Sequence, residues 1–258
     1  MNITIDNIKT NYIVEGEGET ILMLHGWGSN ILPFNPLIKH LSPYYKVYAL
    51  DMPGFGQSEE PQTAWGVDEF VNFIIKFTQE MKIEKAILVG HSFGGECIIK
   101  LANIESLPFQ INKIILMGSA GIRRPKTFKQ KVKIRTYKLG KWFLKLKPIQ
   151  FLYPDALENF QSKSGSADYR AASPLMRQSF VKVVNEVLEE RYFTNVKPST
   201  LLIWGENDTA TPLKDGQYME KTMKDAGLVT VKNAGHYVFL DQTFTVHKVI
   251  DSFLNIKE

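Results

Sequence analysis

The chain has 258 residues, of which 44 % are hydrophobic, and a formal net charge of +4. This length suits one domain with an insertion, and the hydrophobic content is enough for a full core. The single cysteine, Cys97, excludes an internal disulfide and is consistent with a reducing compartment. No apolar run approaches the ~18 residues of a membrane span, and no signal-peptide pattern is evident at the N-terminus. We therefore expect a soluble, cytoplasmic protein.

Short strand-like and helix-like runs alternate along most of the chain. At the N-terminus, Ile3–Ile5 and Asn11–Val14 alternate polar and apolar residues and predict an antiparallel hairpin at a sheet edge. Strands buried on both faces are predicted by six apolar runs: Ile21–Leu24, Val47–Leu50, Ala86–Val89, Lys113–Met117, Leu201–Trp204 and Leu228–Val231. Helices are predicted between or after them at Val67–Met81, Gly94–Ile104, Leu213–Asp225 and Phe244–Leu254. This alternation predicts an α/β protein with a mainly parallel, doubly wound sheet.

The alternation is interrupted in the middle of the chain. No strand-like run occurs from about residue 121 to residue 196, so this stretch is expected to be helical or irregular. Within it, the pair Ser173-Pro174 is typical of an N-cap followed by proline at the first helical position. It predicts a helix over Pro174–Glu190 with its apolar residues mostly on one face.

The positive charge is concentrated in this insertion. Between residues 123 and 147 there are eleven basic residues and no acidic one: Arg123, Arg124, Lys126, Lys129, Lys131, Lys133, Arg135, Lys138, Lys141, Lys145 and Lys147. At 3.6 residues per turn, six apolar residues of the segment fall within about 100° of arc: Phe128, Val132, Leu139, Trp142, Phe143 and Leu146. The pattern predicts a basic amphipathic helix with an aromatic apolar face. Three interpretations remain open: packing on the core, contact with a membrane or lipid surface, and capture of an anionic substrate by Arg123 and Arg124.

The segment Gly90–Gly95 joins the apolar run Ala86–Val89 to a helix-like run. A G-x-S-x-G pattern between a strand and a helix places its serine on a sharp turn, with the hydroxyl exposed at the edge of the sheet. The glycines allow strand and helix to approach closely. Ser92 is therefore the candidate nucleophile, and the His91 side chain is expected to point away from it.

A serine hydroxyl needs an adjacent base at neutral pH. The candidate base is His236, because it lies on a loop just after the last strand-like run. The candidate acid that orients it is Asp208, on the loop after the preceding run, with Glu206 as the local competitor. Surface positions are expected for the histidines in polar helical stretches, His40 and His247.

Five segments in this order make the chain resemble an α/β-hydrolase of the Ser-His-Asp type over nearly its whole length: His25–Gly28, Asp51–Ser58, Gly90–Gly95, Trp204–Asp208 and Gly235-His236. The resemblance implies Ser92 as nucleophile, His236 as base and Asp208 as its orienting acid. Haloalkane dehalogenases and epoxide hydrolases are similar to this chain, but they carry an aspartate at the nucleophile position.

The resemblance also implies an oxyanion hole and a cap. The backbone N–H groups of Trp27 and Phe93 would hold the oxyanion. His25 would brace the loop of Trp27, and it is also a candidate for contact with substrate. The family's fold implies a hydrolase core, residues 1–120 and 192–258, with a helical cap inserted at residues 121–191.

The expected function is hydrolysis of a carboxylic ester through an acyl-enzyme on Ser92. A lipid-like ester is one candidate substrate. One alternative is a C–C bond hydrolase or pyruvate-eliminating synthase acting on an anionic substrate, with four candidate arginines: Arg123, Arg124, Arg170 and Arg177. Another is a non-enzymatic ligand-binding protein on the same fold. The chain has no metal-ligand motif, phosphate loop, dinucleotide fingerprint or nucleic-acid recognition module, so we expect no metal, no cofactor and no nucleic-acid partner. The expected partner is a small-molecule ester or acyl substrate.

Overall fold

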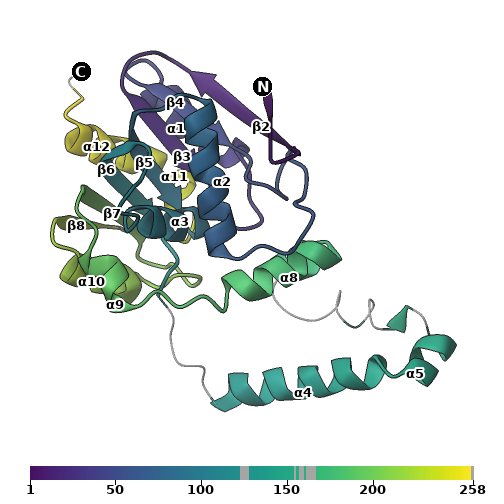
Figure 1. The fold of residues 1–258 in the computed structure, drawn as a ribbon. Coiled ribbons are helices and arrows are strands. Elements are labelled where there is room, and N and C mark those ends of the chain that lie inside the picture. Colours follow the sequence, from purple (N-terminus) through teal and green to yellow (C-terminus); the bar gives the residue numbers. More distant parts are fainter. Residues whose placement is uncertain (123–127, 154, 157–159, 161–166, 257–258) are drawn as a thin grey trace.

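The computed structural model describes residues 1–122, 128–153, 155–156, 160 and 167–256. Its centre is an eight-stranded sheet in the order β1-β2-β4-β3-β5-β6-β7-β8 (Figure 1). The strands are β1 (Asn2–Ile5), β2 (Ile8–Glu15), β3 (Thr20–Leu24), β4 (Lys46–Leu50), β5 (Lys85–His91), β6 (Gln110–Met117), β7 (Ser199–Gly205) and β8 (Ala226–Val231). The pairs β1–β2 and β2–β4 are antiparallel, and all other neighbours are parallel. The predicted mainly parallel sheet with an antiparallel N-terminal edge is confirmed.

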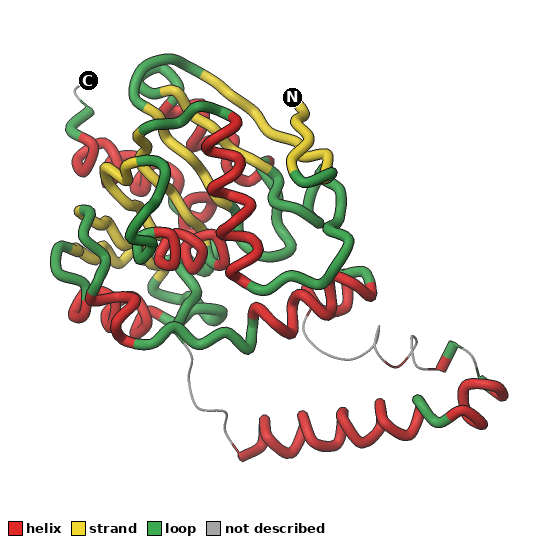
Figure 2. Tube along the Cα trace, viewed as in Figure 1, coloured by secondary structure: helices red, strands yellow, loops and turns green. Residues whose placement is uncertain are grey.

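Helices cover both faces of the sheet (Figure 2). They are η1 (Leu32–Phe34), α1 (Asn35–Leu41), α2 (Val67–Glu80), α3 (Phe93–Leu101), α4 (Phe128–Leu144), α5 (Lys147–Leu152), α7 (Ala167–Ala171), α8 (Pro174–Val183), α9 (Glu190–Thr194), α10 (Leu213–Thr222), α11 (Val238–Asp241) and α12 (Thr243–Leu254). Strand β3 illustrates the layering. Leu22 and Leu24 belong to a buried cluster with α2 and α3, whereas Ile21 and Met23 belong to a second cluster with α1 and α12. Successive side chains of a strand point to opposite faces of the sheet. A strand that is apolar at every position therefore needs helices packed on both faces.

The chain leaves the sheet after β6 and returns at β7. In the described part of this stretch the regular elements are all helices: α4, α5, α7, α8 and α9. Helix α4 is shorter than predicted, because it ends at Leu144 and Leu146 is already the N-cap of α5. Helix α9 spans the predicted boundary between the cap and the second core segment, at residues 191 and 192. Its Phe193 is buried in the same core cluster as Leu22 and Leu24.

Helix α8 begins as predicted and ends earlier. The Ser173 side chain accepts a hydrogen bond from the backbone N–H of Met176 at 3.1 Å, as an N-cap does. The predicted extension to Glu190 is wrong, because the helix stops at Val183. After this end, the chain turns so that Leu188 is buried in the main core, a position that a continued straight helix would not give it.

None of the helices that the structure describes is both long and apolar enough to span a bilayer.

Candidate active site

Ser92 lies on the turn between β5 and α3, with a φ of 51° and a ψ of −115°. A positive φ is strained for a residue that has a side chain. Backbone hydrogen bonds hold the turn, since Ser92 N–H donates to Met117 at 3.1 Å and Ala120 N–H donates to the Ser92 carbonyl at 2.9 Å. A Cβ on Gly94 would overlap the carbonyl of Leu24, so glycine is required for α3 to pack this close to β3. The turn thus places Ser92 at the carboxyl edge of the sheet, outside regular structure.

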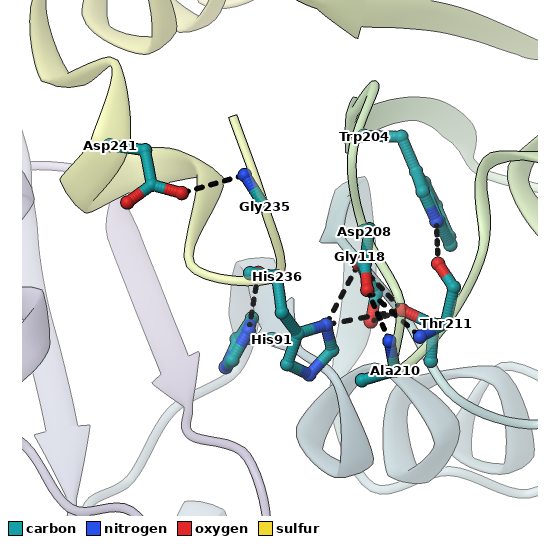
Figure 3. A network of polar contacts seen from close by, with 9 residues as sticks. All are labelled: His91, Gly118, Trp204, Asp208, Ala210, Thr211, Gly235, His236 and Asp241. Carbon is teal, nitrogen blue, oxygen red and sulfur yellow. Dashed lines mark hydrogen bonds and ion pairs between the residues drawn. The ribbon is translucent and has the colours of Figure 1, made fainter. Parts of the chain in front are cut away.

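The imidazole of His236 is held by the carboxylate of Asp208. Nδ1 of His236 lies 2.8 Å from Oδ2 of Asp208 (Figure 3). Because an ionised carboxylate only accepts hydrogen bonds, Nδ1 carries the proton, and in the neutral imidazole Nε2 then has the free lone pair. Burial acts to raise the pKa of Asp208, but the hydrogen bond and charge of His236, with donors from Thr211, lower that pKa below its ordinary value. The pair is therefore an imidazole oriented by a buried, ionised acid.

Thr211 completes the hydrogen bonds of Asp208, and the sequence reasoning missed it. The backbone N–H groups of Ala210 and Thr211 each donate to Oδ1 of Asp208 at 2.9 Å. The Thr211 hydroxyl lies 2.9 Å from both Asp208 Oδ2 and the Gly118 carbonyl, so its one proton serves one of them at a time. The spacing Asp-x-x-Thr is the signal that could have found this turn, because an aspartate commonly accepts from backbone N–H groups just after it.

His91 connects the turn of Ser92 to the loop of His236. Its Nε2 donates to the backbone carbonyl of His236 at 3.0 Å (Figure 3), and its ring packs against Tyr237 and Phe239 with centroids 4.7 and 5.2 Å away. Burial first, and then the charge of His236, lower the pKa of His91 to about 3. His91 is therefore a neutral strut. The contact joins residues 145 positions apart, which no local pattern reveals.

The side chains of the two residues predicted to form the oxyanion hole are in contact. The rings of Trp27 and Phe93 are 5.4 Å apart between centroids. Phe93 is the first residue of α3, so its N–H has no acceptor within the helix and lies at the positive end of the helix dipole. Within the described part of the chain, neither backbone N–H donates a hydrogen bond. Both groups are thus free to receive an oxyanion.

His25 lies beneath this loop and is 2 % exposed. Its Nε2 accepts from the backbone N–H of Met52 at 2.9 Å, so Nδ1 is the nitrogen that donates to the Gly26 carbonyl at 2.7 Å. Burial lowers the pKa of His25, which keeps the ring neutral. Both ring nitrogens of His25 are thus used inside the protein, which leaves neither of them for a hydrogen bond to substrate. Its contacts fit the role of a brace.

A cavity of about 360 Å³ opens beside the Trp27 loop. Its walls include Trp27, Phe55 and Met176. Among the described residues that line it, the one ionisable side chain is that of Glu60, which accepts a hydrogen bond from Ser173. The Phe180 ring of α8 lies 5.4 Å from the Trp27 ring between centroids. The described wall of this cavity therefore combines apolar side chains with polar ones such as Asn30 and Ser173, and it has no basic group. Neither Ser92 nor His236 is among its lining residues.

Two of the arginines predicted to hold an anionic substrate are described, Arg170 and Arg177, and neither lines this cavity. Arg177 is buried and donates from Nε and a terminal nitrogen to the backbone carbonyls of Tyr169 and Arg170, both at 3.1 Å. Arg177 therefore ties α7 to α8, and Arg170 is exposed. Arg123 and Arg124 lie outside the described residues.

The remaining candidates lie outside the site. Glu206 is exposed, so Asp208 is the acid that meets His236. His40 and His247 were predicted to be surface histidines, but they have partners in the protein. Their rings stack with centroids 3.9 Å apart, and His40 Nε2 lies 2.6 Å from Asp251 Oδ1. Among the described residues, no group of three or more His, Cys, Asp or Glu side chains is arranged to hold a metal ion.

The site and the sheet define a class of protein. The α/β hydrolase fold family matches residues 19–243, and the chain belongs to this family. The protein is thus a hydrolase of the α/β fold, in which the Ser-His-Asp arrangement is typical.

Several known proteins are similar to it over nearly their whole length. The 2-hydroxy-6-oxo-2,4-heptadienoate hydrolase of Pseudomonas putida is 23 % identical over 261 residues, covering 96 % of this chain and 93 % of the relative. The structure of a meta-cleavage product hydrolase from Pseudomonas fluorescens IP01 superposes with a TM-score of 0.73 at 25 % identity, covering 99 % and 97 % of the two chains. An enol-lactonase from Burkholderia xenovorans LB400 gives a TM-score of 0.76 at 19 % identity, covering 99 % and 100 %.

Proposed function

We propose that this hydrolase cleaves a carboxylic ester through an acyl-enzyme on Ser92. The observation that carries the proposal is the Asp208–His236 hydrogen bond of 2.8 Å at the same sheet edge as the strained turn of Ser92. A serine activated by an oriented imidazole is the chemistry of acyl transfer. The free N–H groups of Trp27 and Phe93 provide the electrostatic stabilisation that such a reaction needs.

The proposed reaction has two halves. Ser92 Oγ attacks the ester carbonyl, and Nε2 of His236 takes the hydroxyl proton while the N–H groups of Trp27 and Phe93 hold the oxyanion. His236 then donates this proton to the leaving alcohol, which departs and leaves an ester on Ser92. A water molecule attacks that ester, His236 takes a proton from the water, and the carboxylic acid leaves as Ser92 recovers its proton. Asp208 stabilises the imidazolium in both halves.

The surroundings favour a neutral, apolar acyl group. The cavity beside the Trp27 loop has aromatic and methionine side chains in its wall beside small polar ones, and among its described lining residues the one ionisable group is the acid Glu60. A carboxylate-bearing substrate would need a basic partner there. Arg177 is already occupied by two backbone carbonyls.

A C–C bond hydrolase is the second candidate, because similar proteins from Pseudomonas are hydrolases of 2-hydroxy-6-oxo dienoates or meta-cleavage products. Ester hydrolysis and C–C bond hydrolysis would both use the same triad. Comparing the rates with one substrate of each class therefore distinguishes the two functions. We expect kcat/KM for p-nitrophenyl butanoate to exceed that for 2-hydroxy-6-oxo-2,4-heptadienoate. Rapid cleavage of the dienoate with no ester hydrolysis would replace the ester proposal by the C–C one. Failure to turn over either substrate class would favour a ligand-binding role.

The cap and the compartment also belong to the proposal. We assign residues 121–191 to a helical cap on a core of residues 1–120 and 192–258, supported by the run of helices between β6 and β7. The single, buried thiol of Cys97 supports a cytoplasmic setting.

A further inference from the structure

Four large apolar side chains of α4 are exposed to solvent. Helix α4 lies on the outer side of the insertion, away from the sheet (Figure 1). The exposed fractions are 83 % for Phe128, 65 % for Leu139, 61 % for Trp142 and 52 % for Phe143. Several large apolar side chains exposed along one side of a single helix indicate a binding surface. Packing of this face on the core, one of the three interpretations that the sequence left open, does not agree with these exposed fractions. We call the four residues the α4 apolar face.

The opposite side of α4 is the side that meets the insertion. The hydroxyl of Tyr137 lies 3.2 Å from that of Tyr169, and the Tyr137 ring stacks on Phe160 with centroids 5.2 Å apart. At 3.6 residues per turn, Tyr137 lies roughly half a turn from the centre of the α4 apolar face. These contacts fix the rotation of the helix so that the α4 apolar face is on the outer side.

Positive charge borders the same face. Lys138 and Lys145 are exposed beside it, and Arg135 is exposed within the arc that it spans. No acidic residue occurs between residues 123 and 147. Between α4 and α8 lies a cavity of about 440 Å³ whose described wall includes three basic side chains and no acidic one: Lys141, Lys145 and Arg177. The surface around α4 therefore suits an anionic, partly apolar partner.

We propose that α4 docks on the surface of an anionic phospholipid bilayer. An amphipathic helix with Trp, Phe and Leu on one face and Lys or Arg beside it lies in the membrane interface with its apolar face in the acyl boundary. Phosphate groups would neutralise the lysines, and the long basic side chains keep their charges in the headgroup layer. A second copy of the chain is a poorer occupant, because a symmetric contact through α4 would oppose basic surfaces. This proposal does not depend on the reaction assigned to Ser92.

Vesicle binding of the full chain tests the proposal. Sedimentation with phosphatidylcholine vesicles, with and without phosphatidylglycerol, measures partitioning at low and high salt. We expect binding to the anionic vesicles only, weakened by salt. Brominated acyl chains should quench Trp142, and Trp142→Phe should keep binding while losing that quenching.

Paired variants assign the contact to α4. Trp142→Gln with Phe143→Gln should weaken partitioning at least about tenfold, and Lys138→Gln with Lys145→Gln should do the same, since each basic residue contributes about fivefold. The matched control is Phe244→Gln, a 75 % exposed phenylalanine on α12, which should bind like wild type. Circular dichroism checks that each variant is folded.

Other results would overturn the proposal. These are no binding to anionic vesicles, equal binding to neutral and anionic vesicles, or equal loss in the α4 and Phe244 variants. Concentration-dependent dimers that disappear in the Trp142→Gln, Phe143→Gln protein, without vesicle binding, would assign α4 to a contact between copies instead.

Discussion

The lowered pKa of His91 predicts how the stability of this protein depends on pH. Its pKa of about 3 in the folded protein compares with an ordinary value of 6.5 for an unfolded chain. Between these values the unfolded chain binds one proton that the folded protein does not. The stabilisation from the neutral ring is therefore complete above the unfolded pKa and is lost as the pH falls toward 3.

The size of the effect follows from this difference. One pKa unit corresponds to about 1.4 kcal/mol, so His91 accounts for a loss of about 5 kcal/mol over the whole range. From about pH 6.5 to about pH 5, its share of the loss is about 2 kcal/mol.

The perturbation is His91→Gln, because a glutamine amide can still donate to the His236 carbonyl but does not titrate. Urea unfolding, followed by circular dichroism at several pH values, gives the free energy of unfolding for each protein. We expect the variant to be less stable than wild type near neutral pH and to lose about 2 kcal/mol less on acidification to about pH 5. The control is Phe239→Leu, which disturbs the packing on His91 but keeps the titrating ring, so its pH slope should match wild type. Equal slopes for His91→Gln and wild type would refute the reasoning.

Other predictions concern the site and the core. Asp208→Asn should lower kcat by about 10³ to 10⁴ through the wrong imidazole tautomer, whereas Glu206→Gln should stay near wild type in the same steady-state assay; the reverse pattern would move the acid to Glu206. Thr211→Val should lower kcat/KM about tenfold by removing a donor to an ionised group, and the exposed Thr209→Val should not; comparable effects would show that Thr211 has no positioning role. Burial raises the pKa of the Cys97 thiol, so Ellman's reagent should label it only after unfolding, and rapid labelling of the native protein would contradict its place in the core.

The sequence was sufficient for the sheet and for the Asp–His pair because both leave local signals. Strands buried on both faces have uninterrupted apolar runs, and catalytic candidates follow the ends of these runs. The N-cap of α8 was predictable for the same reason, since Ser173-Pro174 is a local motif. Its C-terminal end was not, because burial of Leu188 in the core decides where the chain leaves the helix.

The supports of the site and the direction of α4 could not be predicted in this way. The strut from His91 to the His236 carbonyl and the pairing of His40 with Asp251 join residues far apart in the chain. The helical periodicity of the apolar residues located the α4 apolar face. It did not show whether this face packs on the core or is exposed. The contact of Tyr137 with Tyr169 decides that this face turns outward.

The central claim is that Ser92 carries the acyl group, and the most direct measurement compares ester hydrolysis by wild type and Ser92→Ala. A series of p-nitrophenyl esters from acetate to dodecanoate would be assayed, with circular dichroism to check that both proteins are folded. We expect the variant to lose activity by about 10³-fold or more toward every ester that wild type hydrolyses, because removing the nucleophile of a triad has this scale of effect. A folded Ser92→Ala protein that keeps the wild-type rate would contradict the account.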